Sequence, residues 1–396
     1  MNTEKFTLKN WISLLLPLVL LAGLVYLFLS TNPVQVSSGE LPPIENLAIQ
    51  RVTLPEHGVI KLDVLNAGPD ELTVAQVLVD DAYWDFEIQP SNTLGSLDEG
   101  KMTIYYPWVD TEAHEIVVLT STGATFDAAI EVAAMTPAAS TSKVVAFALV
   151  GVYIGIIPVG LGMLWYPAMR RFSKKTMDFV LSLTVGLLIF LLADTFLEMV
   201  EVSAGIPGVF QGLALGIFAA LITWLFIMAV GNNKQVADRD SAQGRAFVAF
   251  LIALGIGFHN LGEGLVVGAA FAIGEAALGS FLVVGFILHN LTEGIGIAAP
   301  VTKDKPSFGW FVGLLLLSGG PAILGTLIGG FAYSPLLTVV FLGIGVGAIW
   351  QVVVEVGGLL QRGAEREGES VVNWVNLAGL LVGIAVMYGT AFFVKF

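Results

Sequence analysis

A series of long apolar runs limits what this chain can fold into. A helix needs roughly 20 apolar residues to cross the ~30 Å hydrocarbon core of a bilayer. Eight runs of about that length fill residues 144–396, and a composition of 56% hydrophobic and 13% charged residues is typical of membrane proteins. The runs cover 144–167, 177–200, 208–230, 246–272, 276–300, 308–331, 335–360 and 373–394. We therefore expect an α-helical polytopic membrane protein in this part of the chain.

The N-terminal segment, residues 1–32, is expected to form one more membrane helix. Lys5 and Lys9 precede the apolar run Ile12–Leu29. A signal peptide and a signal anchor both have this pattern. No small-x-small cleavage site follows, and the run is longer than the usual signal-peptide core of roughly 7–15 residues. We interpret the segment as an uncleaved anchor with its basic end in the cytoplasm.

Residues 40–135 have the sequence pattern of a small all-β domain. Short stretches rich in β-branched residues, at 59–64, 72–79 and 115–120, are separated by turn signals at 66–70 and 98–101. This pattern predicts a β-sandwich, either immunoglobulin-like or cupredoxin-like in architecture. A linker is expected at 136–143. We interpret His57 and His114, the two histidines of this domain, as surface residues.

Charge and cysteine content exclude several functions for the β-domain. The segment between Thr31 and Ser142 contains seventeen of the 32 acidic residues and only three of the 18 basic ones. Its charge of −14 equals the net charge of the whole chain. The acidic surface is interpreted as a solubilising one, with local enrichment of cations as the alternative. The chain has no cysteine, which rules out disulfides, iron–sulfur clusters and a blue-copper site.

Basic residues gather in alternate loops of the helical region. The loops after the first, third, fifth and seventh runs contain Arg170, Arg171, Lys174, Lys175, Lys234, Arg239, Arg245, Lys303, Lys305, Arg362 and Arg366. The loops on the other side, near 203–207, 273–275 and 333–335, contain no lysine or arginine. The positive-inside rule makes the basic loops cytoplasmic. The β-domain and the C-terminus are then expected outside the cell membrane.

One hexapeptide occurs twice, thirty residues apart, inside the fourth and fifth apolar runs. The copies read His259-Asn260-Leu261-Gly262-Glu263-Gly264 and His289-Asn290-Leu291-Thr292-Glu293-Gly294. Histidine and glutamate four residues apart share one helix face, one turn from each other. Ionisable side chains at membrane depth are costly and normally mark a pathway, a relay or a metal site. The very short connection makes the two helices antiparallel neighbours, with their motifs at similar depth.

Together the two copies provide a ligand set for a divalent metal ion. Imidazole and carboxylate suit Zn²⁺, Fe²⁺ or Mn²⁺, and the amides add neutral oxygen ligands. Gly264 and Gly294 allow close approach of neighbouring backbones. The predicted ligands are His259, Asn260, Glu263, His289, Asn290 and Glu293.

Three other interpretations of the repeat stay open. Polar side chains inside a membrane can simply join helices by hydrogen bonding. A metal-dependent intramembrane hydrolase is a second possibility, although its His-Glu-x-x-His signature is absent. A sensor that reports metal occupancy without moving the ion is a third.

Residues 144–396 resemble the ZIP (Zrt/Irt-like) family of divalent metal transporters, in particular its prokaryotic branch. FHNLGEGLVVG and LHNLTEGIGIA match the family's His-Asn-x-x-Glu-Gly motif in the fourth span and its counterpart in the fifth. The resemblance implies an eight-helix bundle, a binuclear metal centre halfway across the membrane, a homodimer and transport towards the cytoplasm. It assigns His259, Glu263, His289 and Glu293 to one metal site, and Asn260, Asn290 and the same glutamates to the second.

The sequence departs from the family pattern at three positions. Gly262 and Thr292 stand where many members have a proline before the motif glutamate, so the helix breaks are expected to differ. Gly320 precedes the proline of the sixth span, where prokaryotic members often have a glutamate. The second metal site is therefore expected to lose a carboxylate.

Four further polar residues are assigned to the transport pathway. Asp194 and Glu198, near the outer end of the second run, are predicted at the extracellular entrance. Gln351 and Glu355, in the seventh run, are predicted near the cytoplasmic exit. The expected function is transport of divalent transition metal ions, with Zn²⁺ the best fit and Fe²⁺, Mn²⁺ or Cd²⁺ as alternatives. No catalysis, organic cofactor or nucleic-acid partner is expected.

Overall fold

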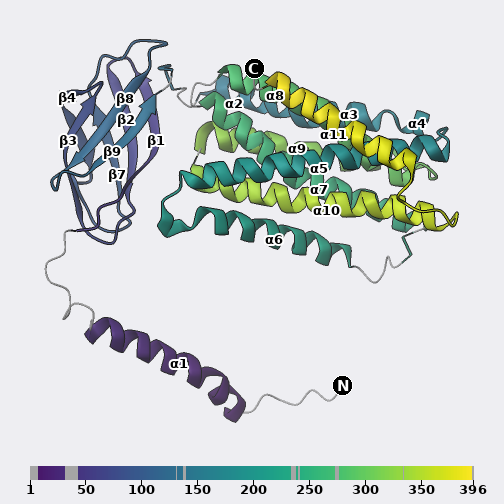
Figure 1. Ribbon diagram of the computed structural model, residues 1–396, viewed down its shortest axis with the longest axis horizontal. Helices are drawn as coiled ribbons and strands as arrows, with labels where there is room; N and C mark the ends of the chain where they lie inside the picture. The colour runs from purple at the N-terminus through teal and green to yellow at the C-terminus, as the bar shows by residue number, and fades with distance from the viewer. Residues whose placement is uncertain are drawn as a thin grey trace. The chain divides into compact units, whose positions relative to one another are not determined.

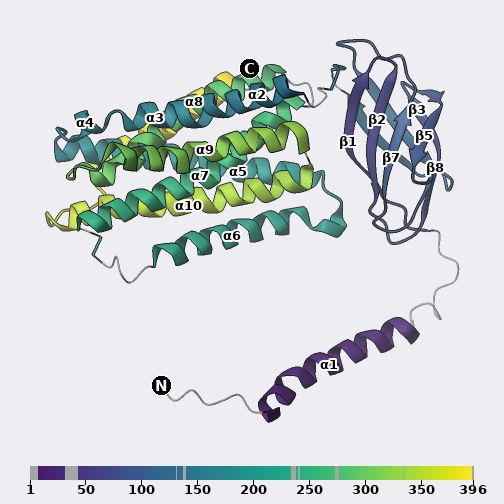
Figure 2. The same ribbon diagram turned by 180° about the vertical axis from the view of Figure 1, so that it is seen from behind.

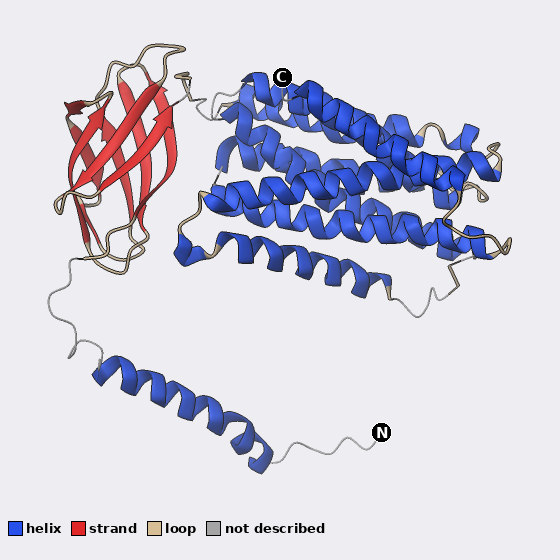
Figure 3. Cartoon of the chain, in the orientation of Figure 1, coloured by secondary structure: helices blue, strands red, loops and turns tan. Residues whose placement is uncertain are grey.

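A computed structural model of the protein describes residues 8–31, 43–130, 132–136, 140–232, 238–239, 241–272, 276–332 and 334–394. The chain divides into two compact units, residues 1–44 and 45–396. The described residues of the first form one helix, and those of the second form a β-domain followed by a helical bundle (Figures 1 and 3).

The first unit contains helix α1 (Leu8–Thr31), which has 24 residues and includes Pro17. Its described side chains from Leu15 to Leu27 are apolar and exposed. At 1.5 Å per residue the helix is ~36 Å long, and its described apolar part is the shorter stretch Leu15–Leu27. The helix expected at 12–29 is confirmed, and its role as an uncleaved anchor stays a prediction.

The β-domain contains two antiparallel sheets that share one core. One sheet has the order β1-β2-β7-β5 and the other β4-β3-β8-β9, with β6 paired to β3. Alternate residues of β2 and β3, such as Ile60, Leu62 and Val77, are fully buried in this common core. An antiparallel β-domain is therefore confirmed. The strands are β1 (Leu47–Glu56), β2 (Val59–Asn66), β3 (Leu72–Val79), β4 (Ala82–Trp84), β5 (Phe86–Gln89), β6 (Thr93–Leu94), β7 (Glu99–Ile104), β8 (His114–Thr120) and β9 (Thr125–Ile130).

The structure corrects two details of the β-domain prediction. The turn expected at 98–101 lies earlier, because β7 begins at Glu99 and Gly100 packs against Val64 of β2. His57 is exposed as expected, but His114 is only 5% exposed. His114 is the first residue of β8 and shares the inward-facing side of the strand with Ile116, which explains its burial.

The helical region is a bundle of long apolar helices. Seven helical segments of the described chain are long and apolar enough to cross a membrane, which is the pattern of a multi-pass membrane protein. The last expected span, 373–394, is helix α11, whose described apolar part is shorter. The elements are α2 (Thr141–Gly151), η1 (Val152–Ile156), α3 (Ile157–Met163), α4 (Tyr166–Met169), α5 (Lys174–Ala204), η2 (Gly208–Phe210), α6 (Gly212–Gly231), α7 (Ala242–Ala272), α8 (Ala276–Ala298), η4 (Ala299–Val301), α9 (Phe308–Ala332), α10 (Pro335–Glu365) and α11 (Trp374–Val394).

The first span is interrupted by the π-helical turn η1. Pro158 follows this turn and has no backbone N–H, so the carbonyl of Ile154, four residues earlier, loses its helical donor. Helices α7 and α8, in contrast, run without a break through both motifs, where Gly262 and Thr292 replace proline.

Glycines bring the motif helices into direct backbone contact with their neighbours. A methyl group on Gly264 of α7 would overlap the carbonyl oxygen of Ala322 on α9. A methyl group on Gly294 of α8 would overlap the carbonyl oxygen of Val159 on α3. Both glycines of the repeat therefore permit close approach, as expected, and they place each motif against a second helix.

Candidate metal centre

The two motifs meet in the interior of the bundle. His259 and Glu263 come from α7, and His289 and Glu293 come from α8. All four side chains are buried, with between 2% and 5% of their surface exposed. The spacing of four residues puts each pair on one helix face, as the sequence predicts.

Glu263 joins the two histidines. Its Oε1 lies 2.8 Å from Nε2 of His259 and 2.5 Å from Nε2 of His289. The imidazole rings are 6.2 Å apart between centroids. One carboxylate thus contacts both imidazoles between α7 and α8.

The two asparagines are oriented by backbone carbonyls of neighbouring helices. Nδ2 of Asn290 donates to the carbonyl of Ile154 at 2.8 Å, the group that Pro158 leaves without a helical donor. Nδ2 of Asn260 donates to the carbonyl of Ser318 at 3.0 Å, close to Pro321 in α9. Because only the amide nitrogen can donate to a carbonyl, these contacts fix which side of each amide carries the oxygen.

Four buried oxygens of the two motifs have no hydrogen-bond partner. They are Oδ1 of Asn260, Oδ1 of Asn290, and both carboxylate oxygens of Glu293. Buried polar atoms normally have partners, and a buried carboxylate without one is especially costly. A cluster that contains only unused acceptors is suited to a cation.

The donor atoms match a transition metal ion. One ligand atom each from His259, His289 and Glu293 lies within 4.8 Å of the others. A tetrahedral Zn²⁺ with ligand bonds near 2.0–2.2 Å holds its ligand atoms roughly 3.3 Å apart. A small movement of these side chains would therefore bring all three onto one ion, and Glu263 lies within hydrogen-bonding distance of both imidazoles to join or orient them.

A cavity of about 30 Å³ adjoins the cluster and is lined on one side by α5. A cavity needs about 10–15 Å³ to hold one water molecule, so this space can hold about two. Asp194 and Glu198, the predicted entrance residues, line it together with His259 and Glu263. The structure thus brings the predicted entrance and the predicted metal ligands to the same cavity.

The other pathway residues lie elsewhere. Gln351 and Glu355 line a separate groove between α6 and α10, where Gln351 Nε2 donates to Glu355 Oε1 at 3.1 Å. Gly320 has no atom within 4 Å of the place where a Cβ would stand, and Leu316 and Leu324, one turn away on either side, are exposed. In this structure position 320 faces outward, so its missing carboxylate does not change the cluster.

Sequence reasoning missed several groups that shape the centre. Thr195 lines the cavity beside Asp194, and the carbonyls of Ile154 and Ser318 orient the asparagines. Pro158, inside the first apolar run, is the available signal for the freed carbonyl of Ile154 at membrane depth. Pro321 frees the carbonyl of Leu317 and gives no such signal for Ser318.

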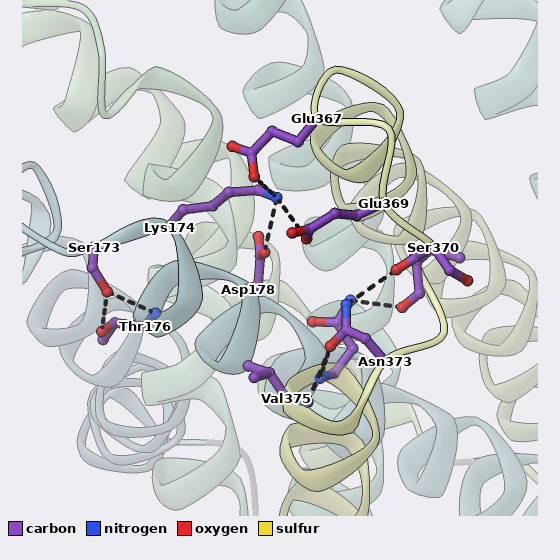
Figure 4. A network of polar contacts seen from close by, with 11 residues as sticks. Ser173, Lys174, Thr176, Asp178, Glu367, Glu369, Ser370, Asn373 and Val375 are labelled. Atoms are coloured by element: carbon purple, nitrogen blue, oxygen red, sulfur yellow. Dashed lines mark hydrogen bonds and ion pairs between the residues drawn. The ribbon is translucent and has the colours of Figure 1, made fainter.

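Contacts at one end of the bundle join the basic loops. Arg245, at the start of α7, pairs with Asp304, and Arg170 Nε donates to the Thr302 carbonyl at 3.2 Å. Lys174 lies 2.7 Å from Glu367, 3.6 Å from Glu369 and 3.7 Å from Asp178 (Figure 4). These contacts connect the loops after the first, fifth and seventh spans with the start of the fourth. Lys174 already provides the positive charge among these carboxylates, which makes the cluster in Figure 4 an interhelical ion network.

Comparison with known proteins does not identify a family. No family model matches the chain, and no curated protein matches it. Among the solved structures that match is the archaellum periplasmic stator protein FlaG from Sulfolobus acidocaldarius, with a TM-score of 0.20 and 16% identity. The match covers 22% of this chain and 99% of that one.

Proposed function

We propose that the protein transports divalent transition metal ions, with Zn²⁺ as the best-fitting substrate, through the centre formed by α7 and α8. The observation that carries this proposal is the set of four unpartnered buried oxygens beside two histidines. Such a set lacks positive charge, and a metal ion supplies it. The resemblance of both motifs to the ZIP family agrees with the same function.

The cavity beside Asp194 and Glu198 supports passage of the ion. It extends from the buried ligands towards α5, and its acidic lining attracts cations. His and carboxylate ligands accept Zn²⁺, Fe²⁺ and Mn²⁺, and selectivity among these ions depends on site geometry and on which ion is available. Protonation of the ligands weakens metal binding and offers a means of release.

The proposed direction is into the cytoplasm of a cell whose plasma membrane contains the helical bundle. The contacts of Arg170, Arg245 and Lys174 are consistent with basic loops gathered on one side. The positive-inside rule makes that side cytoplasmic. The β-domain and the C-terminus are then extracytoplasmic.

Uptake of ⁶⁵Zn²⁺ into proteoliposomes tests the proposal. We expect uptake by the wild type and loss of uptake in His289→Ala and Glu263→Ala. Arg171→Ala, at an exposed position in a basic loop, serves as the control and is expected to transport normally. Unchanged uptake in both motif variants would contradict the proposal. Stoichiometric metal binding without uptake would instead support a sensor.

A further inference from the structure

A second hollow, the α6–α10 groove, lies on the outside of the bundle. Its volume is about 610 Å³, within the usual range for ligand pockets of roughly 300–1,000 Å³. Helix α6 lies beside α10 at the edge of the bundle in both views (Figures 1 and 2). Its lining includes Trp224, Leu225, Met228, Arg239, Val354 and Glu355.

The groove contains a fixed cation with an unused donor. Arg239 Nη2 donates to the carbonyl of Gly231 at 2.7 Å, and the guanidinium lies 5.1 Å from the centroid of the Phe247 ring. These contacts hold the guanidinium in place, yet its Nη1 has no hydrogen-bond partner. Nε1 of Trp224, in the same lining, also has none. Both N–H donors are buried as well as unused, so a phosphate group would contact them after a movement of these side chains.

The groove also contains a carboxylate. Glu355 accepts a hydrogen bond from Gln351, whose own Oε1 is buried without a partner. Among the described residues, neither Arg239 nor Glu355 has a salt-bridge partner. They are the only two charged residues among the described ones that line the groove. A ligand that satisfies both must therefore carry a negative and a positive group.

The charged part of the groove lies at the depth of lipid headgroups. Helix α6 has 20 residues up to Gly231, a length of ~30 Å, and Glu355 follows Pro335 in α10 by a similar length. Both therefore lie about one hydrocarbon thickness from the opposite membrane surface. The apolar lining residues Leu225, Met228 and Val354 are exposed, as expected for side chains in contact with an acyl chain.

We propose that the α6–α10 groove binds a zwitterionic phospholipid with a primary ammonium headgroup, of the phosphatidylethanolamine type. The phosphate contacts Arg239 Nη1 and Trp224 Nε1, the ammonium contacts Glu355, and one acyl chain follows the apolar lining. The inference uses the membrane placement in the proposed function but does not depend on metal transport.

Native mass spectrometry of the full chain in detergent tests this proposal. The probes are phosphatidylethanolamine, phosphatidylcholine and phosphatidylglycerol with identical acyl chains. We expect one phosphatidylethanolamine per chain, bound roughly three- to tenfold more tightly than the other two lipids, the range given by one polar contact in a membrane protein. Arg239→Gln is expected to weaken binding of all three lipids, because it removes the phosphate contact.

Glu355→Gln is the decisive variant, because it is expected to abolish the preference for phosphatidylethanolamine while phosphate binding remains. Glu365→Gln is its matched control: Glu365 lies on the same helix and also accepts a hydrogen bond from a glutamine four residues earlier, at 2.9 Å. Arg171→Gln controls for loss of positive charge at an exposed position. Equal binding of the three lipids by the wild type, tighter binding of phosphatidylglycerol, or an unchanged preference in Glu355→Gln would each overturn the proposal. Zinc uptake, measured on the same samples, reports separately on the proposed function.

Discussion

The helical bundle and the β-domain each bury a histidine beside a carboxylate, but the two clusters differ in how their oxygens are used. In the β-domain, Asp80 Oδ2 accepts from Tyr106 at 2.6 Å and contacts His114 Nδ1 at 2.8 Å. Its Oδ1 accepts from the backbone N–H of Glu115 at 2.9 Å. In the bundle, both oxygens of Glu293 are without a partner.

The hydrogen bonds around Asp80 shift the pKa values of Asp80 and Tyr106 in opposite directions. Burial raises the pKa of Asp80, but the hydrogen bonds from Tyr106, Glu115 and His114 outweigh it and the net shift is downward. The same Asp80–Tyr106 hydrogen bond, with burial and nearby negative charge, raises the pKa of Tyr106 to about 12. This carboxylate is stabilised by the protein itself and has little need of a cation.

The comparison separates a structural histidine–carboxylate cluster from a candidate binding site. Residue type does not distinguish them, because His, Asp and Glu occur in both. The difference is that the protein satisfies Asp80 with its own donors and leaves Glu293, Asn260 Oδ1 and Asn290 Oδ1 available. Substitutions in the two clusters should therefore have opposite effects on stability and on metal handling.

Glu293→Gln is expected to have the largest effect. It removes a proposed metal ligand, so ⁶⁵Zn²⁺ uptake should fall at least about 100-fold, beyond the 10- to 100-fold typical of residues that only support ligands. It also removes a buried carboxylate that lacks a partner, so the Tm of the metal-free protein should stay equal or rise. Uptake and differential scanning fluorimetry on the same preparation measure both effects.

Thr292→Ser provides the control for Glu293→Gln, because Thr292 is on the same turn and its hydroxyl donates to its own helix, at the carbonyl of His289. It should change neither uptake nor Tm appreciably. A marked fall in the Tm of metal-free Glu293→Gln would show that the carboxylate has a structural partner, and the contrast with Asp80 would be lost.

The sequence predicted the grouping of the motif side chains better than it predicted their surroundings. Spacing of four residues on a helix put His259 beside Glu263 because helical geometry is local. Placing Asn290 against Ile154 required knowing that α8 packs on η1, a contact between residues 136 positions apart. The surface position predicted for His114 is wrong, because a polar residue at the start of a strand gives no sign of its partner Asp80. Alternation with Ile116 was the signal available for its burial.

Asp80→Asn is expected to destabilise the β-domain by about 1–2 kcal/mol. Hydrogen bonds to a charged group contribute roughly 1.5–3 kcal/mol when buried, and the Asp80 side chain is 41% exposed, so we expect the lower part of that range. Hydrogen exchange of β3 and β8 in the full chain, followed by mass spectrometry, measures the loss. Zinc uptake should not change.

Asp110→Asn is the matched control for Asp80→Asn. Asp110 also faces a histidine, His57, but at 3.8 Å and with both side chains at least 60% exposed. It should leave hydrogen exchange unaltered. Equal protection in the wild type and Asp80→Asn would mean that hydrogen bonding does not distinguish the two histidine–carboxylate clusters.

Tyr106 should give the β-domain a specific pH dependence, smaller than the effect of Asp80→Asn. Its pKa is near 12 in the folded domain and about 10 when unfolded, so the unfolded chain loses its proton first. This contribution to stability is complete below pH ~10 and is lost as the pH rises towards about 12. Asp80 affects stability at acid pH instead. Its contribution to the stability of the β-domain is present above pH ~3.9 and is lost as the pH falls through the lowered pKa that Asp80 has in the folded domain.

Stability of the β-domain between pH 8 and 12 in Tyr106→Phe and Tyr105→Phe tests this pH dependence, since Tyr105 is the adjacent, exposed tyrosine. Tyr106→Phe should flatten the alkaline fall in hydrogen-exchange protection, and Tyr105→Phe should leave it as in the wild type. An identical alkaline fall in all three proteins would assign it to groups other than Tyr106.

Lys174→Met is expected to have the smallest effect, although Lys174 contacts more carboxylates than any residue of the metal centre. The side chain is 31% exposed and its partner Glu367 is 51% exposed, so water screens the attraction. Exposed ion pairs contribute little to stability, so the Tm should fall by at most a few degrees, and zinc uptake should be unchanged. A loss of uptake comparable to that of Glu293→Gln would show that a fully paired charge cluster controls transport. In that case unpartnered oxygens would no longer be the feature that separates a functional charge cluster from a structural one.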